Sequence, residues 1–175
     1  MKVSVIVSIY NGANILPVTL PPLFNQDYPK IFTEIILIND ASTDDTTKLL
    51  ERSEWEERCK IIQHTNNLGL AAARNSGIKA ATGDILIFLD CDIEVRTDFI
   101  SKHVELCKKP QIIGILSNIR TKQPDAKNKF YRYIFFGKRG ARVIGANKPL
   151  PFNYFILGCT SVKASALKKT GKFNE

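Results

Sequence analysis

A short apolar run that ends in two carboxylates constrains the fold of this chain more than any other sequence feature. Residues 84–92 read Asp-Ile-Leu-Ile-Phe-Leu-Asp-Cys-Asp. Five consecutive large apolar residues are typical of a strand that is buried on both faces, as in a parallel sheet covered by helices. Residues two apart on a strand point the same way, so Asp90 and Asp92 converge if the extended geometry persists to the end of the strand.

The carboxylate pair allows two interpretations. Two like charges held together in a partly dry site repel each other, and a divalent cation removes that repulsion. Mg²⁺ typically binds one or two carboxylates together with the phosphates of a substrate. In the alternative interpretation, the two Asp residues only end the strand and cap the turn that follows it.

The length and composition predict one globular domain. A chain of 175 residues is large enough to bury roughly 70% of the surface that it exposes when unfolded. No apolar stretch approaches the roughly 20 residues that a membrane-spanning helix needs. Residues 1–7 show a strand pattern without a small-residue cleavage site, so we expect no signal peptide.

The cysteines and histidines show no pattern that is typical of a zinc site or a disulfide framework. The four cysteines are scattered and form no C-x-x-C pair, which favours a reducing compartment and predicts a cytoplasmic protein. His64 and His103 are single residues without a second ligand at metal spacing. We expect each on the surface or on a helix face, rather than as a ligand or base.

The formal charge of +8 is concentrated in one segment, residues 120–148. This segment contains nine basic residues and one acid, Asp125, with five aromatic residues interleaved. Such a segment suits an anionic partner, which includes a phosphorylated substrate, an acidic membrane surface or a nucleic acid. The alternative is a solvated amphipathic helix whose aromatic residues pack on the core.

The first half of the sequence alternates between strand and helix patterns. Strands are predicted at 3–9, 35–39, 60–63 and 85–89, and helices at about 14–25, 43–57 and 69–81. Ser42 and Asp45 resemble a capping box at the start of the second helix, and Gly83 can supply a left-handed stop after the third. Further on, a helix is predicted at 97–107, strands at 112–119 and 154–162, and a short helix at 165–169. Strand–helix alternation with short connections implies an α/β fold with a parallel sheet and right-handed crossovers.

Polar residues follow three of the predicted strands at the end where ligands of open α/β sheets bind. These strand ends are residues 8–11, 39–42 and 90–92. Together they place an aromatic ring, an acid and a carboxylate pair on one edge of the sheet. That combination is expected for a site that binds a base, a ribose and a metal-bound diphosphate.

In these strand ends and in several further segments, the chain resembles the nucleotide-sugar-binding part of a family 2 glycosyltransferase with the GT-A fold. The matching segments, in order along the chain, are residues 3–11, 36–46, 67–77, 83–92 and 171–175. The resemblance implies a Rossmann-like, mostly parallel sheet flanked by helices on both faces. It also implies one GT-A domain over 1–175 that is incomplete at its C-terminus, with a nucleotide-binding half at 1–92 and the start of an acceptor half at 93–175.

The resemblance implies roles for three residues at the nucleoside. Ser8 and Tyr10 would contact the nucleoside, with the Tyr10 ring against the base, and Asp40 would accept a hydrogen bond from the base, such as the uracil N3–H. Each residue has a structural alternative. Tyr10 would then be a strand-end aromatic, Asp40 a turn former and Ser8 a small residue at a strand end, where the family often has Pro.

Three further residues are implied at the diphosphate and the metal ion. Arg74 would approach the diphosphate or hold the nucleotide pocket together, although an Arg on a helix is often only solvated. Asp92 would bind the metal ion, Mn²⁺ or Mg²⁺, directly. Asp90 would contact the ribose or reach the metal ion through water.

The implied reaction is an inverting transfer of a sugar from a nucleotide diphosphate, preferably UDP, to an acceptor hydroxyl on a polysaccharide, lipid-linked or cell-surface glycan. In-line attack needs a general base, and in this family the base lies beyond the segment that ends here at Glu175. The alternative is a nucleotide-sugar-binding fragment or relic that lacks the base.

Three alternative functions fit the sequence less well. The turn after the first strand lacks the G-x-G-x-x-G of a NAD-binding fold and the Gly-rich basic loop of a sugar-nucleotide pyrophosphorylase. Nucleic-acid binding would rest on the segment 120–148 alone, and we do not favour it. Peripheral contact of that segment with an anionic membrane stays an expectation.

Overall fold

The computed structural model describes residues 1–52, 55, 57–120, 127, 144, 148–151 and 157–174. The basic segment 120–148 lies outside these ranges, apart from Arg120, Lys127, Ile144 and Lys148, and so do Glu175 and the first residues of the predicted strand 154–162. None of the helices in the described ranges is long and apolar enough to cross a membrane.

The described elements follow the predicted order of strands and helices. In chain order they are β1 (Val3–Ile9), α1 (Leu16–Phe24), the 3-10 helix η1 (Lys30–Phe32), β2 (Thr33–Asn39), α2 (Thr46–Leu50), β3 (Lys60–Gln63), α4 (Gly69–Ala80), β4 (Ile85–Asp90), α5 (Phe99–Cys107), β5 (Gly114–Leu116), β6 (Cys159–Lys163) and α7 (Ala164–Thr170). The bounds of β1 and β3 are those predicted, whereas β5 is shorter than the predicted strand 112–119. Helix α2 is also shorter than predicted.

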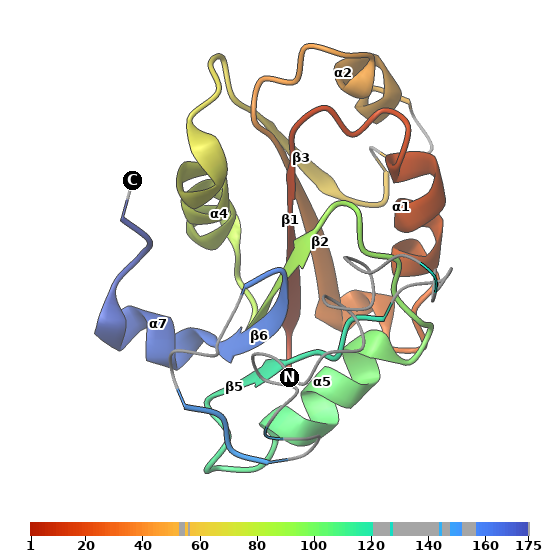
Figure 1. The fold of residues 1–175 in the computed structure, drawn as a ribbon. Helices are drawn as coiled ribbons and strands as arrows, with labels where there is room; N and C mark the ends of the chain where they lie inside the picture. The colour runs from red at the N-terminus through yellow and green to blue at the C-terminus, as the bar shows by residue number, and fades with distance from the viewer. Residues whose placement is uncertain are drawn as a thin grey trace.

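The strands form one six-stranded sheet in the order β3-β2-β1-β4-β6-β5. The pairs β3–β2, β2–β1 and β1–β4 are parallel, whereas β6 is antiparallel to both β4 and β5. Figure 1 shows α4 and α7 on one side of the sheet, and α1 and α5 on the other. The predicted α/β class, with a mostly parallel sheet flanked by helices on both faces, is confirmed.

Two apolar clusters bury the two faces of the sheet. One cluster joins the strands to α1, α2 and α5, and the other joins them to α4, α7 and Phe173. All five apolar residues at 85–89 are at most 4% exposed, because alternate side chains of β4 enter opposite clusters. The prediction of a strand buried on both faces is therefore confirmed.

Two local predictions were wrong. Ser42 does not cap a helix, because its hydroxyl donates to Asn39 Oδ1 at 2.5 Å and accepts from the Asn11 N–H at 2.9 Å. Asp44 instead accepts a hydrogen bond from the N–H of Thr46, the first residue of α2, at 3.0 Å. Gly83 does not have a left-handed backbone. A Cβ at this position would lie 2.6 Å from the backbone nitrogen of Ser4, so close backbone approach explains the glycine.

His103 is buried, which corrects the surface alternative predicted for it. It lies on the inner face of α5 and is only 4% exposed, with Nδ1 2.7 Å from Ser161 Oγ and Nε2 2.9 Å from Ser117 Oγ. Burial disfavours the charged ring and lowers the pKa of His103 to about 4. The ring is therefore neutral at pH 7 and connects α5 to β6.

The buried ring predicts an acid-sensitive fold. The folded pKa of His103 lies below the unfolded value of 6.5, so the unfolded chain binds more protons and stability falls as pH falls from about 6.5 towards 4. We expect the free energy of unfolding to drop by about 2 kcal/mol between pH 7 and pH 5 from this residue alone. Urea unfolding of wild type and His103→Asn at both pH values measures the difference. An equal loss in both proteins would contradict the assignment.

Candidate functional site

The carboxyl ends of β1, β2 and β4 lie side by side. Ser8 of β1 pairs in register with Ile38 of β2 and with Asp90 of β4. The N–H of Asp40, the residue after β2, donates to the carbonyl of Ile9 at 2.9 Å. The polar residues that the sequence places after separate strands are thus brought to one edge of the sheet.

A pocket of about 250 Å³ opens at this edge. Its lining residues are Ser8, Ile9, Tyr10, Asp40, Asn67, Gly69, Leu70 and Ala73. The structure therefore brings together the three residues predicted at a nucleoside. Tyr10 and Leu70 are each 50% exposed, so they offer apolar surface that a flat ligand can cover. A second pocket is lined by Pro17, Pro21 and Phe24 of α1 together with Arg52, Trp55 and Arg58, and these described lining residues include no carboxylate.

Asp40 is almost completely buried and strongly hydrogen-bonded. Its Oδ1 accepts from His64 Nδ1 at 2.7 Å and from the Leu68 N–H at 3.0 Å, and its Oδ2 accepts from the Gly69 N–H at 2.8 Å. Burial raises the pKa of Asp40, but these three hydrogen bonds together outweigh it and bring the pKa below its ordinary value. Gly69 has φ +85°, a conformation that favours glycine. Asp40 is therefore an ionised acceptor that anchors the start of α4.

His64 is a site residue that the sequence reading missed. Rather than lying on the surface or on a helix, its side chain is only 8% exposed and connects Asp40 to Ser76 of α4, with Nε2 2.9 Å from Ser76 Oγ. Asn39 and Gln63 end paired parallel strands and are partners in register, which the folded sheet reveals and the sequence does not. The residues that follow them, Asp40 and His64, must then be neighbours.

Arg74 and Asp90 form an ion pair beside the pocket. Arg74 Nη2 lies 3.2 Å from Asp90 Oδ1 and 3.3 Å from the Leu157 carbonyl oxygen. The Arg74 side chain is 14% exposed, so the pair is partly shielded from solvent. Arg74 is thus not merely solvated, and it connects α4 to β4 and to the residues before β6.

The chain does not stay extended from Asp90 to Asp92, as the same-side alignment of the two carboxylates required. Asp90 is the last residue of the strand, and Cys91 and Asp92 lie in a turn closed by the Ile93 N–H on the Asp90 carbonyl at 3.1 Å. Same-side alternation therefore does not apply to Asp92. The two carboxylates still interact, because burial raises the pKa of Asp90 and the charge of Asp92 raises it further, against the opposing effect of Arg74.

The donor set fits a divalent cation that also binds phosphate. Asp90 and Asp92 carry two negative charges against the single positive charge of Arg74, and burial together with the charge of Asp92 raises the pKa of Asp90. Among the described residues, no group of three or more His, Cys, Asp or Glu residues could hold a metal ion. One or two carboxylates are what Mg²⁺ uses when substrate phosphates complete its coordination.

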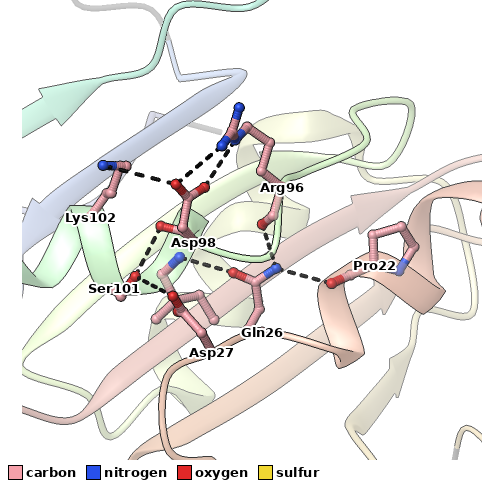
Figure 2. A network of polar contacts seen from close by, with 8 residues as sticks. Pro22, Gln26, Asp27, Arg96, Asp98, Ser101 and Lys102 are labelled. Carbon is pink, nitrogen blue, oxygen red and sulfur yellow. Dashed lines mark hydrogen bonds and ion pairs between the residues drawn. The ribbon is translucent and has the colours of Figure 1, made fainter.

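The loop that carries Asp92 is tied to the end of α1, as Figure 2 shows. Gln26 Nε2 donates to the carbonyl oxygens of Pro22 at 3.0 Å and Arg96 at 2.7 Å, and its Oε1 accepts from the Ile100 N–H at 3.0 Å. Ser101 of α5 donates to Asp27 Oδ2 at 3.1 Å. These contacts fix the distal end of the loop, so the position of Asp92 depends on packing between α1 and α5.

The C-terminal described residues pack on α4 beside the ion pair. Both polar groups of the buried Asn75 amide bond the backbone of Phe173, at 2.9 and 3.0 Å. The Phe173 ring packs edge-on against Phe88 of β4 at 5.5 Å and lies 5.9 Å from the Arg74 guanidinium carbon. Arg74 is thus enclosed by β4 and by residues 171–174.

Comparison with known proteins identifies the family. The model of glycosyl transferase family 2 matches residues 4–171, which is nearly the whole chain. The chain belongs to this family. The resemblance read from the sequence motifs is therefore confirmed.

Relatives and solved structures agree with this assignment. The poly(ribitol-phosphate) beta-N-acetylglucosaminyltransferase TarS of Staphylococcus aureus is 36% identical over 103 residues, which cover 58% of this chain and 17% of TarS. The mannosyltransferase PcManGT of Pyrobaculum calidifontis, solved with GDP-Man and Mn²⁺, superposes with a TM-score of 0.75 at 26% identity, covering 99% of this chain and 47% of that chain. TarS 1–349 with UDP-GlcNAc has a TM-score of 0.69 at 22% identity, covering 97% and 47%, and supports the GT-A fold alone. This chain spans less than half the length of each.

The close fit between Gly158 and Asp90 predicts that substitutions at these two residues have non-additive effects on stability. A Cβ at Gly158 would lie 2.7 Å from Asp90 Oδ2, and the Gly158 backbone is not left-handed, so this contact is the cost of an alanine. Asp90 Oδ2 is the end of a side chain that is 42% exposed and can rotate away, so we expect Gly158→Ala to lower the free energy of unfolding by only about 0.5–1 kcal/mol, through loss of the Arg74–Asp90 pair. In an Asp90→Ala background the same substitution should cost close to nothing, because the clashing carboxylate is gone. Urea unfolding of the four proteins measures the coupling, and equal costs in both backgrounds would contradict it.

Proposed function

We propose that this chain forms the donor-binding region of an inverting glycosyltransferase that uses a nucleotide diphosphate sugar, with UDP-sugars preferred. The observation that carries the proposal is the single edge of the sheet where the Ser8–Tyr10–Asp40 pocket adjoins the Arg74–Asp90 ion pair. A family 2 assignment over residues 4–171 supports transfer of a sugar. The UDP-GlcNAc and GDP-Man bound by structural neighbours support nucleotide-sugar donors as the class.

The pocket residues would bind the nucleoside. The half-exposed Tyr10 ring offers a flat surface for base stacking. Ser8 pairs in register with Asp90 at the carboxyl ends of β1 and β4. The ionised Asp40 carboxylate is an acceptor, which suits a base that presents an N–H such as uracil N3–H. Two carbonyl oxygens flank that N–H in uracil, so a single acceptor facing it is well matched.

The charged residues would bind the ribose and the diphosphate. Asp92 is proposed to hold Mn²⁺ or Mg²⁺, with Asp90 contacting the ribose or the hydrated ion. When bound, the divalent ion supplies positive charge that stabilises the leaving diphosphate. Arg74 would remain paired with Asp90, from which it lies 3.2 Å away, or would turn to add charge stabilisation for the diphosphate.

The acceptor half is a proposal that extends beyond the described residues. Poly(ribitol-phosphate) is the acceptor named for TarS, and we propose a polysaccharide, lipid-linked or cell-surface glycan hydroxyl as the acceptor class here. The general base is expected from residues that follow Glu175 in the family pattern. Cytoplasmic location and contact of segment 120–148 with an anionic membrane also stay proposals.

Removal of the proposed metal ligand Asp92 should weaken donor binding. We expect UDP to bind the wild-type chain in the presence of Mn²⁺, and Asp92→Ala to weaken this binding at least about tenfold, because the ion loses a direct ligand. Calorimetric titration with and without Mn²⁺ measures both affinities. Asp84→Asn is the matched control, since Asp84 precedes β4 at the opposite end of the strand and bonds the Lys2 N–H. An affinity for UDP that is unchanged by removal of Mn²⁺ and by Asp92→Ala would argue against the proposed site.

Substitution of Tyr10 separates stacking from hydrogen bonding. We expect Tyr10→Phe to bind UDP about as well as wild type, and Tyr10→Ala to lose about tenfold or more, because an aromatic face contributes about 1–3 kcal/mol per stacked base. Tyr10 is 50% exposed, so neither change should shift the melting temperature appreciably. An Ala variant with unchanged affinity for UDP would show that the ring is only a strand-end aromatic.

A further inference from the structure

The Asp40 carboxylate has almost no acceptor capacity left for a ligand. A carboxylate offers about four acceptor positions, two on each oxygen. The His64 ring and the Leu68 N–H occupy both positions on Oδ1, and the Gly69 N–H occupies one on Oδ2. Counting the described residues, one acceptor position therefore remains, and it is on Oδ2.

Hydrogen bonds to both ring nitrogens and to the backbone hold His64 in the contact that fills Oδ1. An ionised carboxylate only accepts hydrogen bonds, so the hydrogen of the 2.7 Å contact must be on His64 Nδ1. In the neutral ring Nε2 then accepts from the Ser76 hydroxyl, at 2.9 Å. The backbone of His64 is fixed as well, because its N–H donates to the Asn39 carbonyl at 2.9 Å. Ser76 and the end of β2 thus orient the ring towards Asp40.

Nucleobases differ in how many acceptors they require from such a carboxylate. Uracil presents one N–H donor, at N3. Guanine presents two adjacent donors, at N1 and at the exocyclic amine, and pairing both with a carboxylate needs one acceptor position on each oxygen. With Oδ1 filled, a carboxylate can satisfy the single donor but not the adjacent pair. An unpaired amine in a partly dry pocket is costly.

We propose that His64, oriented by Ser76, is a positioning residue that determines nucleobase selectivity through Asp40. By occupying Oδ1 it leaves Oδ2 as a single acceptor, which favours a base with one N–H donor and disfavours paired donation by guanine. This inference rests on the proposed function, because it assumes that the base of the donor lies against Asp40. The presence of a donor site does not by itself imply a preference for one base, so selectivity is the added prediction.

The wild-type protein provides a first test that needs no substitution. Calorimetric titration with UDP, GDP and inosine diphosphate, each with Mn²⁺, compares bases with one donor, two adjacent donors and one donor on a purine. We expect UDP to bind more tightly than GDP, and GDP to bind no more than about twofold more tightly than inosine diphosphate, because the extra amine finds no acceptor. A GDP advantage of about tenfold over inosine diphosphate would overturn the inference while leaving nucleotide binding intact.

A variant pair then tests His64 itself. His64→Ala frees Oδ1, so the affinity ratio of GDP to inosine diphosphate should rise about tenfold, the value of one hydrogen bond to a charged group. His64→Asn retains a donor and should keep the wild-type ratio, which a merely structural role does not predict. A folded His64→Ala protein with an unchanged ratio would overturn the inference. If wild type binds none of the three nucleotides, the proposed function fails and this inference fails with it.

Discussion

Burial of the parallel sheet on both faces is the constraint on which the rest of this structure depends. Each central strand exchanges its backbone hydrogen bonds with two neighbours and places alternate side chains in two separate apolar clusters. Little room remains for charged groups along the strands themselves. Carboxylates such as Asp40 and Asp90 therefore lie at or just after the last residue of a strand. Because parallel strands end at the same edge, these residues collect there and form one site.

The site is electrostatically incomplete in a way that suits its proposed ligands. Asp40 is satisfied by three donors and has a lowered pKa, whereas Asp90 is disfavoured as an anion by burial and by Asp92. One carboxylate is thus prepared to orient a neutral base, and the other lies beside a place where added positive charge is favourable. Arg74 supplies part of that charge, and Phe173 and Asn75 hold α4 in position around it.

The parts of the fold that follow from local pattern were predictable. The apolar run at 85–89 and the strand pattern at 3–9 each predicted their strand, because the apolar composition that favours a buried strand is contained in a few neighbouring residues. The capping box at Ser42 failed because a hydroxyl has several partners to choose from, and Asn11 and Asn39 approach from other elements. The carboxylate pair was correctly placed at the end of β4, but the turn at Cys91 ended the extended geometry from which the same-side alignment of Asp90 and Asp92 was predicted.

The sequence by itself determined the strands of the parallel sheet, the edge at which the polar residues gather and the residue types at the strand ends, since these depend on periodicity and on motifs within short segments. Only the tertiary structure decided that His64 fills one oxygen of Asp40, that Gly158 leaves space for Asp90, and that Asn75 binds Phe173. Each of these contacts joins segments between 24 and 98 residues apart in the sequence. The partners in these contacts depend on how strands pair and helices pack, so the sequence of a single segment does not predict them.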